Sequence, residues 1–542
     1  MKLLRVHVAA AQSCGGLLDG LDVCLRDATA STDVFEPLCL IGPNGAGKSQ
    51  FIQVIAEAFQ AVLHAYVPSE ERSECNPDLQ FEIEYLIYSD AGDDPVHVRV
   101  SRMAEGKRRP IVRISRRADA DWVECDPRNP STLALLPTKV VGYTSGANET
   151  LSLPFLVSRA GYADEVATLA LRSLEAKTPA ADSRLMLIDY GTHLEVLVAN
   201  LLLGSAKQRT ALLEDVRVDD LHSFRCVIQL AHSAVPRAPS SRARHRKGIQ
   251  LTNELEAYID QLRRCATAYK HEPSTDSYTF DFLVSTETRK AFKHFWKSSL
   301  ALYGSLHKVA MLNDLAIPKA TRSRFRQETQ QRKFASRLPE PQDEDKVFRF
   351  ERVEFVATGG KGIVDYVSLS DGEHQMAQLL GTMCMVSFPN VLFLLDEPES
   401  HFNPLWRVKL LSRVLALPTT NGPRNEFCEA ALQDAFLTTH SPFVASDMNK
   451  ERVFIFRKNP ESKQIEVRHP YIETFGTTFD AILSECFDIE PPISGVSMAR
   501  IEKLSTSNDP EEIQKGMGEL GDSVEKAMLA DRVRQLKRES GQ

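Results

Sequence analysis

The sequence predicts a mixed α/β fold: a core of sheet and helix, split by a long, mainly helical insertion and followed by a helical tail. Two short apolar strands are each followed by a distinctive turn. The strand Leu38–Ile41 precedes a glycine-rich loop, and the strand at 391–395 precedes two carboxylates. Between them, apolar residues recur at helical spacing through the middle of the chain. The core strands are therefore expected to come together from distant parts of the sequence.

The length and composition are those of a multi-domain globular protein. At 542 residues the chain is too long for one compact core, and about two to four folding units are expected. Hydrophobic residues make up 43% and charged residues 25%, as in ordinary globular proteins. The formal net charge is −8, so any contact with nucleic acid must come from local basic patches.

Several features predict a cytoplasmic protein without membrane contact. The ten cysteines include no CxxC pair, which favours a reducing compartment over a disulfide framework. The first residues alternate as in a β-strand, and His7 and Gln12 interrupt the run expected of a signal peptide. The longest apolar stretch carries Pro389 and Asn390 in its middle, which argues against a membrane span.

Changes between strand-like and helical sequence patterns divide the chain into parts. Strand-like runs from Leu79 to Val141 predict a β-rich lobe. Long helices follow, one capped by Asn253 and another running from Thr286 to about Leu312. We expect four parts: an N-terminal core half at 1–147, a mainly helical docking insertion at 148–345, a C-terminal core half at 346–470 and a helical tail at 471–542.

The segment GPNGAGKS matches the phosphate-binding loop G-x-x-x-x-G-K-[ST] and lies between a buried-type strand and an amphipathic helix. Its backbone N–H groups and the helix N-terminus favour phosphate. Lys48 would reach the β- and γ-phosphates of ATP, and the Ser49 hydroxyl would bind Mg²⁺. The predicted ATP-binding residues here are Gly42, Pro43, Asn44, Gly45, Ala46, Gly47, Lys48 and Ser49.

Paired carboxylates end the apolar strand of VLFLLDEP. Asp396 is placed to hold Mg²⁺, and Glu397 to orient and deprotonate the attacking water.

Two further sequence elements are expected to contact the γ-phosphate of ATP. LSDGE opens a helix, and Ser370 with the backbone of Gly372 would contact the γ-phosphate of an ATP held by another nucleotide-binding half. The strand FLTTHSP ends at His440, which is placed to hydrogen-bond the γ-phosphate as a second catalytic residue. Their order along the chain is the plan of ABC-type ATPases.

The four elements together resemble the ABC-type ATPase head of the RecF, SMC and OLD group. Within it, the chain resembles restriction-system-associated AAA family ATPases and the PtuA ATPases of Septu and retron-linked Septu systems. Three segments carry the narrower resemblance: 135–155, 396–404 and 475–489. It implies a homodimer through the heads and a separate effector nuclease of HNH type. Asp371 departs from the usual second glycine, and Asn148 or Glu149 is the candidate for the lid residue.

Three basic clusters are candidate DNA or RNA contacts. No zinc, HNH-like or TOPRIM-like arrangement accompanies them, and of the remaining polar residues Glu399 and His401 stand out beside the carboxylates. The clusters are Lys107, Arg108, Arg109, Arg113, Arg116 and Arg117; then Arg237, Arg242, Arg244, His245, Arg246 and Lys247; then Arg322, Arg324, Arg326, Arg332 and Lys333.

These features predict an ATPase of an anti-phage defence system that regulates or senses for a separate nuclease. Two alternatives stay open at this point: a RecF-like ATPase of DNA repair or recombination, and a scaffold that binds ATP with little turnover. An intact Glu397 argues against the scaffold.

Overall fold

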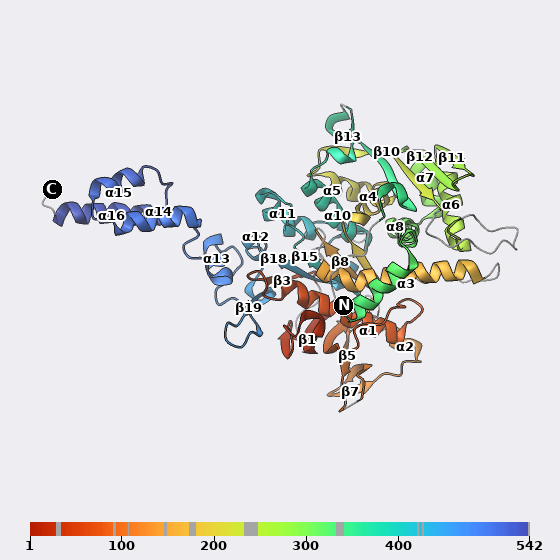
Figure 1. Cartoon of the computed structure of the whole chain (residues 1–542), viewed down its shortest axis with the longest axis horizontal. Helices are drawn as coiled ribbons and strands as arrows, with labels where there is room; N and C mark the ends of the chain where they lie inside the picture. The colour runs from red at the N-terminus through yellow and green to blue at the C-terminus, as the bar shows by residue number, and fades with distance from the viewer. Residues whose placement is uncertain are drawn as a thin grey trace.

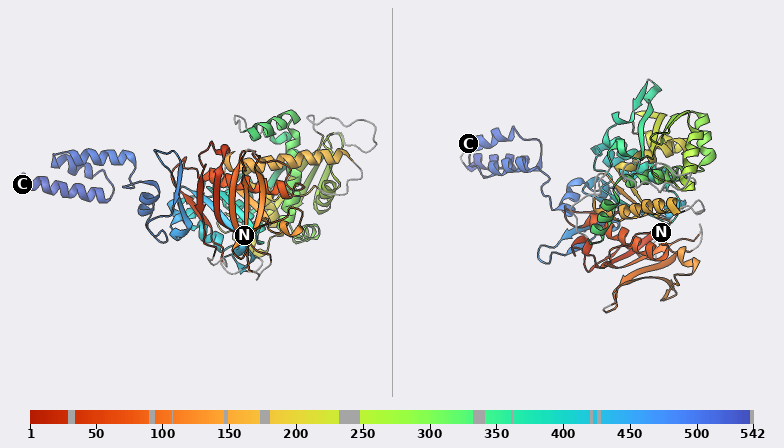
Figure 2. Two further views of the ribbon diagram at one scale, coloured as in Figure 1. Left: turned by 90° about the horizontal axis from the view of Figure 1, so that it is seen from below. Right: turned by 45° about the vertical axis from the view of Figure 1, so that its right-hand side comes forward.

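The computed structural model describes residues 1–28, 34–89, 94–106, 108–145, 149–172, 180–231, 248–331, 341–360, 362–419, 422–424 and 428–539. Three large sheets with helices between them form the body, and a group of helices at the C-terminus stands away from it (Figures 1 and 2). The predicted α/β class is confirmed.

The central sheet has seven strands in the order β20-β19-β3-β18-β15-β8-β9. All neighbours pair in parallel except β19 and β20. The middle strands are buried on both faces, which explains their unbroken apolar sequences. The strands are β3 (Leu38–Ile41), β8 (Lys139–Thr144), β9 (Leu185–Ile188), β15 (Val391–Asp396), β18 (Asp434–Thr439), β19 (Val453–Lys458) and β20 (Ile465–Arg468).

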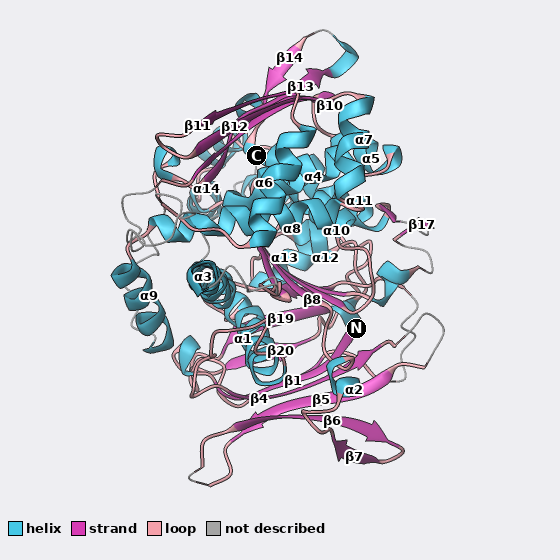
Figure 3. Ribbon diagram, turned by 90° about the vertical axis from the view of Figure 1, so that its right-hand side faces the viewer, coloured by secondary structure: helices cyan, strands magenta, loops and turns pink. Residues whose placement is uncertain are grey.

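An antiparallel sheet of six strands, in the order β2-β1-β4-β5-β6-β7, forms the β-rich lobe. Helix α1 (Lys48–Tyr66) lies between this sheet and the central one (Figure 3), and its apolar side chains share one core with both. The strands are β1 (Lys2–Ala10), β2 (Leu21–Cys24), β4 (Gln80–Ile87), β5 (Val96–Met103), β6 (Ile111–Ala118) and β7 (Asp121–Glu124).

Helices cover the other face of the central sheet, and a third sheet of five strands packs beyond them (Figure 3). Its order is β11-β12-β10-β13-β14, with β10 (Val218–Gln229), β11 (Ala268–Glu272), β12 (Ser277–Leu283), β13 (Phe348–Ala357) and β14 (Ile363–Asp365). The helices of the body are α2 (Pro130–Leu133), α3 (Glu149–Arg172), α4 (His193–Leu203), α5 (Ala206–Leu213), α6 (Asn253–Cys265), α7 (Thr286–Phe295), α8 (Ser299–Ala310), α9 (Lys319–Gln331), α10 (Asp371–Met385), α11 (Pro404–Leu415) and α12 (Pro442–Ala445).

The middle of the chain differs from its predicted form. It also supplies β9 to the central sheet and three strands to the third sheet, so it is not a purely helical insertion. The helix expected from Thr286 is two helices, because Ser298 has an extended backbone and its side chain caps α8 by accepting from Ala301 N. The cap of α6 is Thr252, not Asn253.

The tail begins with α13 (Phe479–Phe487), followed by α14 (Gly495–Thr506), α15 (Pro510–Met517) and α16 (Val524–Glu539). The last three helices pack on one another around Leu504, Ile513 and Leu529 and stand apart from the body (Figure 1). Among the helices of the described residues, none combines the length and apolarity needed to cross a membrane.

Candidate functional site

The loop Gly42–Ser49 connects the end of β3 to the start of α1. Its backbone needs glycine: Gly42 has φ 141° and Gly47 has φ 87°. A Cβ at Gly42 would lie 2.2 Å from the carbonyl oxygen of Phe456, so any side chain there would displace the neighbouring strand. The glycines of this motif therefore shape a tight turn against the central sheet.

Lys48 is nearly buried at the first position of α1. Its Nζ donates to the carbonyl oxygens of Gly42, at 2.8 Å, and Pro43, at 3.0 Å. Burial lowers the pKa of Lys48 to about 8, against the opposing effect of Glu397 and Asp396. The ammonium thus remains mostly protonated at neutral pH and places a cation inside the loop.

Ser49 and the predicted metal-binding carboxylate are brought together across the core. The Ser49 hydroxyl donates to Asp396 Oδ1 at 2.9 Å, and the Thr438 hydroxyl donates to the same oxygen at 2.6 Å. Burial raises the pKa of Asp396, while the two hydroxyl donors partly offset this. A buried carboxylate beside a hydroxyl is an oxygen donor set that suits Mg²⁺.

Glu397 and His440 lie side by side at the carboxyl ends of β15 and β18. His440 Nε2 is 3.2 Å from Glu397 Oε1, and the side chains are 32% and 42% exposed. The hydrogen bond to His440 lowers the pKa of Glu397, so this carboxylate is ionised and accessible to water. Glu397 has φ 46°, a left-handed backbone rarely found outside glycine, and its N–H donates to Thr438 Oγ1.

Two threonines in this site were not singled out from the sequence. Thr438 joins Asp396 to the backbone of Glu397, and the Thr439 hydroxyl donates to the buried Glu399. Burial raises the pKa of Glu399 to about 7. The sequence signal that could have identified these threonines is their position: two hydroxyl side chains end the apolar strand β18, next to the acidic turn that follows β15.

Ser370 and Gly372 lie at the start of α10. Ser370 caps this helix together with Glu373: Ser370 N donates to Glu373 Oε2 at 2.8 Å, and Glu373 N donates to Ser370 Oγ. A Cβ at Gly372 would lie 2.9 Å from the carbonyl oxygen of the exposed His401. This close approach fixes the first turn of α10 against the segment that follows the carboxylates.

One predicted basic contact is wrong. Arg322 is buried, forms an ion pair with Asp164 and donates to the carbonyl oxygen of Ile317, so it is structural. Arg116 and Arg117 are exposed on β6, and Arg113 beside them pairs with Glu105 at 2.6 Å. Several predicted residues lie outside the part of the chain that the structure describes: the cluster at 237–247, Lys107, Arg332, Lys333, the side chain of Arg326 and the lid candidate Asn148. The other lid candidate, Glu149, is the first residue of α3.

Comparison with known proteins relates part of this chain to a family of AAA domains. A family model described as "AAA domain, putative AbiEii toxin, Type IV TA system" matches residues 256–447, which include Ser370, both carboxylates and His440. Among solved structures, the SMC head domain from Thermotoga maritima is similar over 87% of this chain and 100% of that chain, with 10% sequence identity and a TM-score of 0.32. No curated protein matches. In its motifs and in the family segment that it matches, the chain is similar to P-loop ATPases.

Proposed function

We propose that this chain is a Mg²⁺-dependent ATPase that pairs through its heads with a second copy, and that its ATP state regulates a separate effector nuclease. One observation carries the ATPase assignment: Ser49, Asp396, Glu397 and His440 meet at one edge of the central sheet, beside Lys48. Phosphate-loop enzymes need this combination of a cation, a metal ligand set and an ionised carboxylate.

Each residue has a distinct role in this proposal. Lys48 and the loop N–H groups bind the phosphates, and Ser49 with Asp396 hold Mg²⁺, which offsets charge on the phosphate oxygens. Glu397 takes the proton from the attacking water, and His440 holds the Glu397 side chain in place through their hydrogen bond. Thr438 sets the orientation of both carboxylate-bearing residues.

The second part of the proposal is a composite site between two copies, to which Ser370 contributes. Ser370 is exposed at the start of α10, where a helix N-terminus favours phosphate, and we assign this surface to the γ-phosphate of an ATP held by a second copy. We expect Ser370→Arg to abolish hydrolysis and ATP-dependent pairing, because a bulky cation would enter the interface, while ATP binding by the monomer changes little.

Ser370→Ala is the matched control, because it removes the same helix cap, worth about 1 kcal/mol, without adding a cation. It should retain more hydrolysis than Ser370→Arg. Hydrolysis, ATP affinity and mass by light scattering would be measured for both. A large loss of ATP affinity in monomeric Ser370→Arg protein would contradict a contact made in trans.

The regulatory part of the proposal rests on resemblance and on the chemistry of the chain. The PtuA-like segments suggest a defence setting with an HNH-type nuclease partner, and the matching family description names a type IV TA system. The carboxylates singled out in the sequence are already assigned to ATP, whereas phosphodiester cleavage needs its own metal and water positions. The ATP-dependent pairing would then be the two-state element that restrains or releases the partner.

We therefore expect the purified chain to hydrolyse ATP but to cleave neither DNA nor tRNA with Mg²⁺ or Mn²⁺, and to restrict phage only with a partner protein. The assay uses single- and double-stranded DNA and tRNA, with Lys48→Ala protein as the control. Cleavage that persists in Lys48→Ala protein after repeated purification would mean that the chain is itself a nuclease.

A RecF-like role in DNA repair is the second candidate, favoured by the exposed arginines of β6. Binding to nucleic acid without any partner protein would support it.

A further inference from the structure

A second glutamate, Glu399, is buried beside the ATPase site. It lies two residues after Glu397 in the turn that follows β15, and it is 3% exposed. Two backbone hydrogen bonds close this turn: Ser400 N donates to Glu397 O at 3.1 Å, and Phe402 N donates to Glu399 O at 3.0 Å. One closed turn therefore carries both glutamates.

The side chain of Glu399 is joined to the end of β18. The Thr439 hydroxyl donates to Glu399 Oε1, and the same hydroxyl oxygen accepts from Ser441 N at 2.8 Å. His440 lies between Thr439 and Ser441, where the chain turns from β18 into α12. These two linked hydrogen bonds span His440 and set the direction in which its side chain leaves the backbone.

Three contacts join the turn after β15 to the end of β18. Two of them involve Glu397: its N–H donates to Thr438 Oγ1 at 3.0 Å, and its side chain meets His440 Nε2 at 3.2 Å. The third joins Thr439 to Glu399, and both of these residues are buried, so water does not compete for their hydrogen bond. This buried contact holds the two chain segments together next to the exposed pair of Glu397 and His440.

The stability of the fold does not by itself account for a carboxylate at this position. Burial of a carboxylate costs free energy, and an apolar pair of similar shape is often as stable as a buried polar one. The second oxygen of Glu399, Oε2, makes no hydrogen bond among the described residues. The placement of His440 gives this side chain a purpose that an apolar residue would not serve.

We propose that Glu399 is a positioning residue for ATP hydrolysis: through Thr439 it fixes the segment that carries His440, and so holds His440 against Glu397. This role rests on the proposed ATPase function, in which Glu397 takes the proton from the attacking water. Because Glu399 acts only through His440, its loss should slow the chemical step and leave ATP binding in place.

The test measures steady-state hydrolysis by full-length Glu399→Leu, Thr439→Val and Glu399→Gln protein. The first two remove the buried hydrogen bond and should lower kcat by about 10- to 100-fold, as for a misplaced catalytic group, with KM within about 2-fold of the wild type. Glu399→Gln keeps an oxygen that accepts from Thr439 and should retain kcat within about 3-fold. Thr132→Val is the matched control: Thr132 is 2% exposed and its hydroxyl donates to Asp126 O at 2.8 Å, so Tm should fall while kcat stays unchanged.

A second background tests whether the effect passes through His440. In His440→Ala protein, Thr439→Val should change kcat by less than about 2-fold, because the side chain that Thr439 positions is already gone. Equal losses in the two backgrounds, or full activity of Thr439→Val protein, would overturn the positioning role. Should Glu399→Leu protein not fold, Thr439→Val removes the same hydrogen bond and decides the outcome.

Crystal structures of the nucleotide-free variants give a readout that does not require hydrolysis. In Thr439→Val and Glu399→Leu protein, the His440 ring should lie beyond hydrogen-bond distance of Glu397, whereas in Glu399→Gln protein it should keep its place. An undisplaced His440 in both of the former would overturn the positioning role. Wild-type protein without ATPase activity would contradict the proposed function, and the position of His440 would still decide the role of Glu399.

Discussion

Glu397→Gln protein is expected to bind ATP and to lose hydrolysis by about 100- to 10,000-fold in kcat, the contribution typical of a general base. The amide is isosteric and still accepts the hydrogen bond from His440, but it cannot take a proton from water. Lys48 and Ser49 are unchanged, so ATP affinity should be close to that of the wild type. The bound state would accumulate as a dimer with ATP held at both composite sites.

Lys48→Ala is the contrasting control, because it removes the cation that contacts the phosphates and should abolish binding itself. Equilibrium ATP binding, steady-state hydrolysis and mass in solution, measured for both variants, separate the two roles. Equal hydrolysis by wild-type and Glu397→Gln protein would remove Glu397 from the mechanism.

Asp434→Ala is expected to lower the free energy of unfolding by about 3–5 kcal/mol, since it leaves Arg26, whose side chain is only 11% exposed, without its counter-ion. Asp434 is fully buried at the start of β18. Both its oxygens accept from Arg26, at 2.7 and 2.8 Å, and it also accepts from the backbone N of Leu3 and Ala435. The pair therefore ties the β-rich lobe to the central sheet.

The pair Arg5–Asp22 gives a matched comparison in the same lobe. It has the same two-bond geometry, at 2.9 and 2.6 Å, but its side chains are 36% and 43% exposed. Asp22→Ala should therefore cost less than about 1 kcal/mol. Urea unfolding followed by circular dichroism would compare the two, and equal costs would show that burial does not determine the strength of this contact.

The parts of the site that the sequence predicts are those with local signals. The turn at Gly42 and Gly47 has backbone angles that favour glycine, so the glycines of the motif predict this turn. The two carboxylates follow a strand that is too apolar to be exposed, so their position at the edge of the sheet is also predicted by the sequence. The sequence contains no local signal for the role of Thr438. Its hydrogen-bond partners, Asp396 and the N–H of Glu397, come close to Thr438 only when β15 and β18 pair. Ser370 was placed correctly at a helix start, but its trans role is still a prediction.

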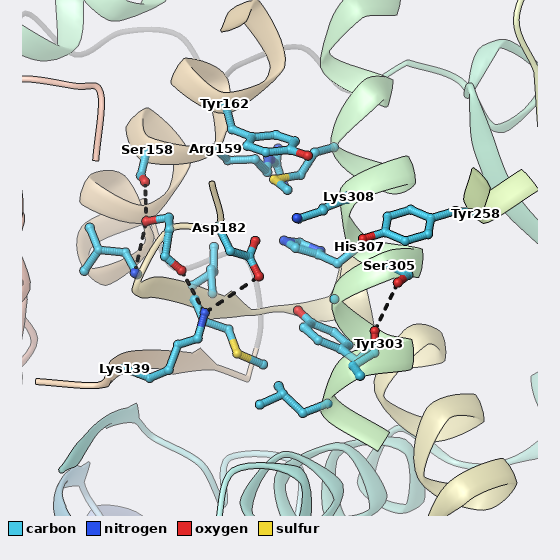
Figure 4. A pocket seen from close by; sticks show the side chains of 18 of the residues that line it. Lys139, Ser158, Arg159, Tyr162, Asp182, Tyr258, Tyr303, Ser305, His307 and Lys308 are labelled. Carbon is cyan, nitrogen blue, oxygen red and sulfur yellow. Dashed lines mark hydrogen bonds and ion pairs between the residues drawn. The ribbon is translucent and has the colours of Figure 1, made fainter. Parts of the chain in front are cut away.

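The middle of the chain was harder to predict for a related reason. The apolar residues from Phe292 to Leu306 keep a helical period across Trp296, which hides the break that Ser298 introduces. A cavity of about 530 Å³ between α3, α8 and the strands β8 and β9 (Figure 4) is less visible still. Its wall joins Lys139, Tyr162, Asp182 and His307, and their nearness depends on the packing of α3 and α8 against the last two strands of the central sheet. Hydrophobic period alone does not report tertiary contacts of this kind.

The order of strands in the central sheet has a consequence for biosynthesis. In the described structure β3 pairs only with β18 and β19, and about 400 residues separate it from the first of them. At a translation rate of about 5–20 residues per second, roughly 20–80 s pass between the synthesis of the apolar strand β3 and that of its first pairing partner. The antiparallel lobe meets no such delay, because β1, β4, β5 and β6 pair among the first residues made. Folding of the nascent chain is thus expected to begin with the lobe, and the phosphate loop acquires its shape only near the end of translation.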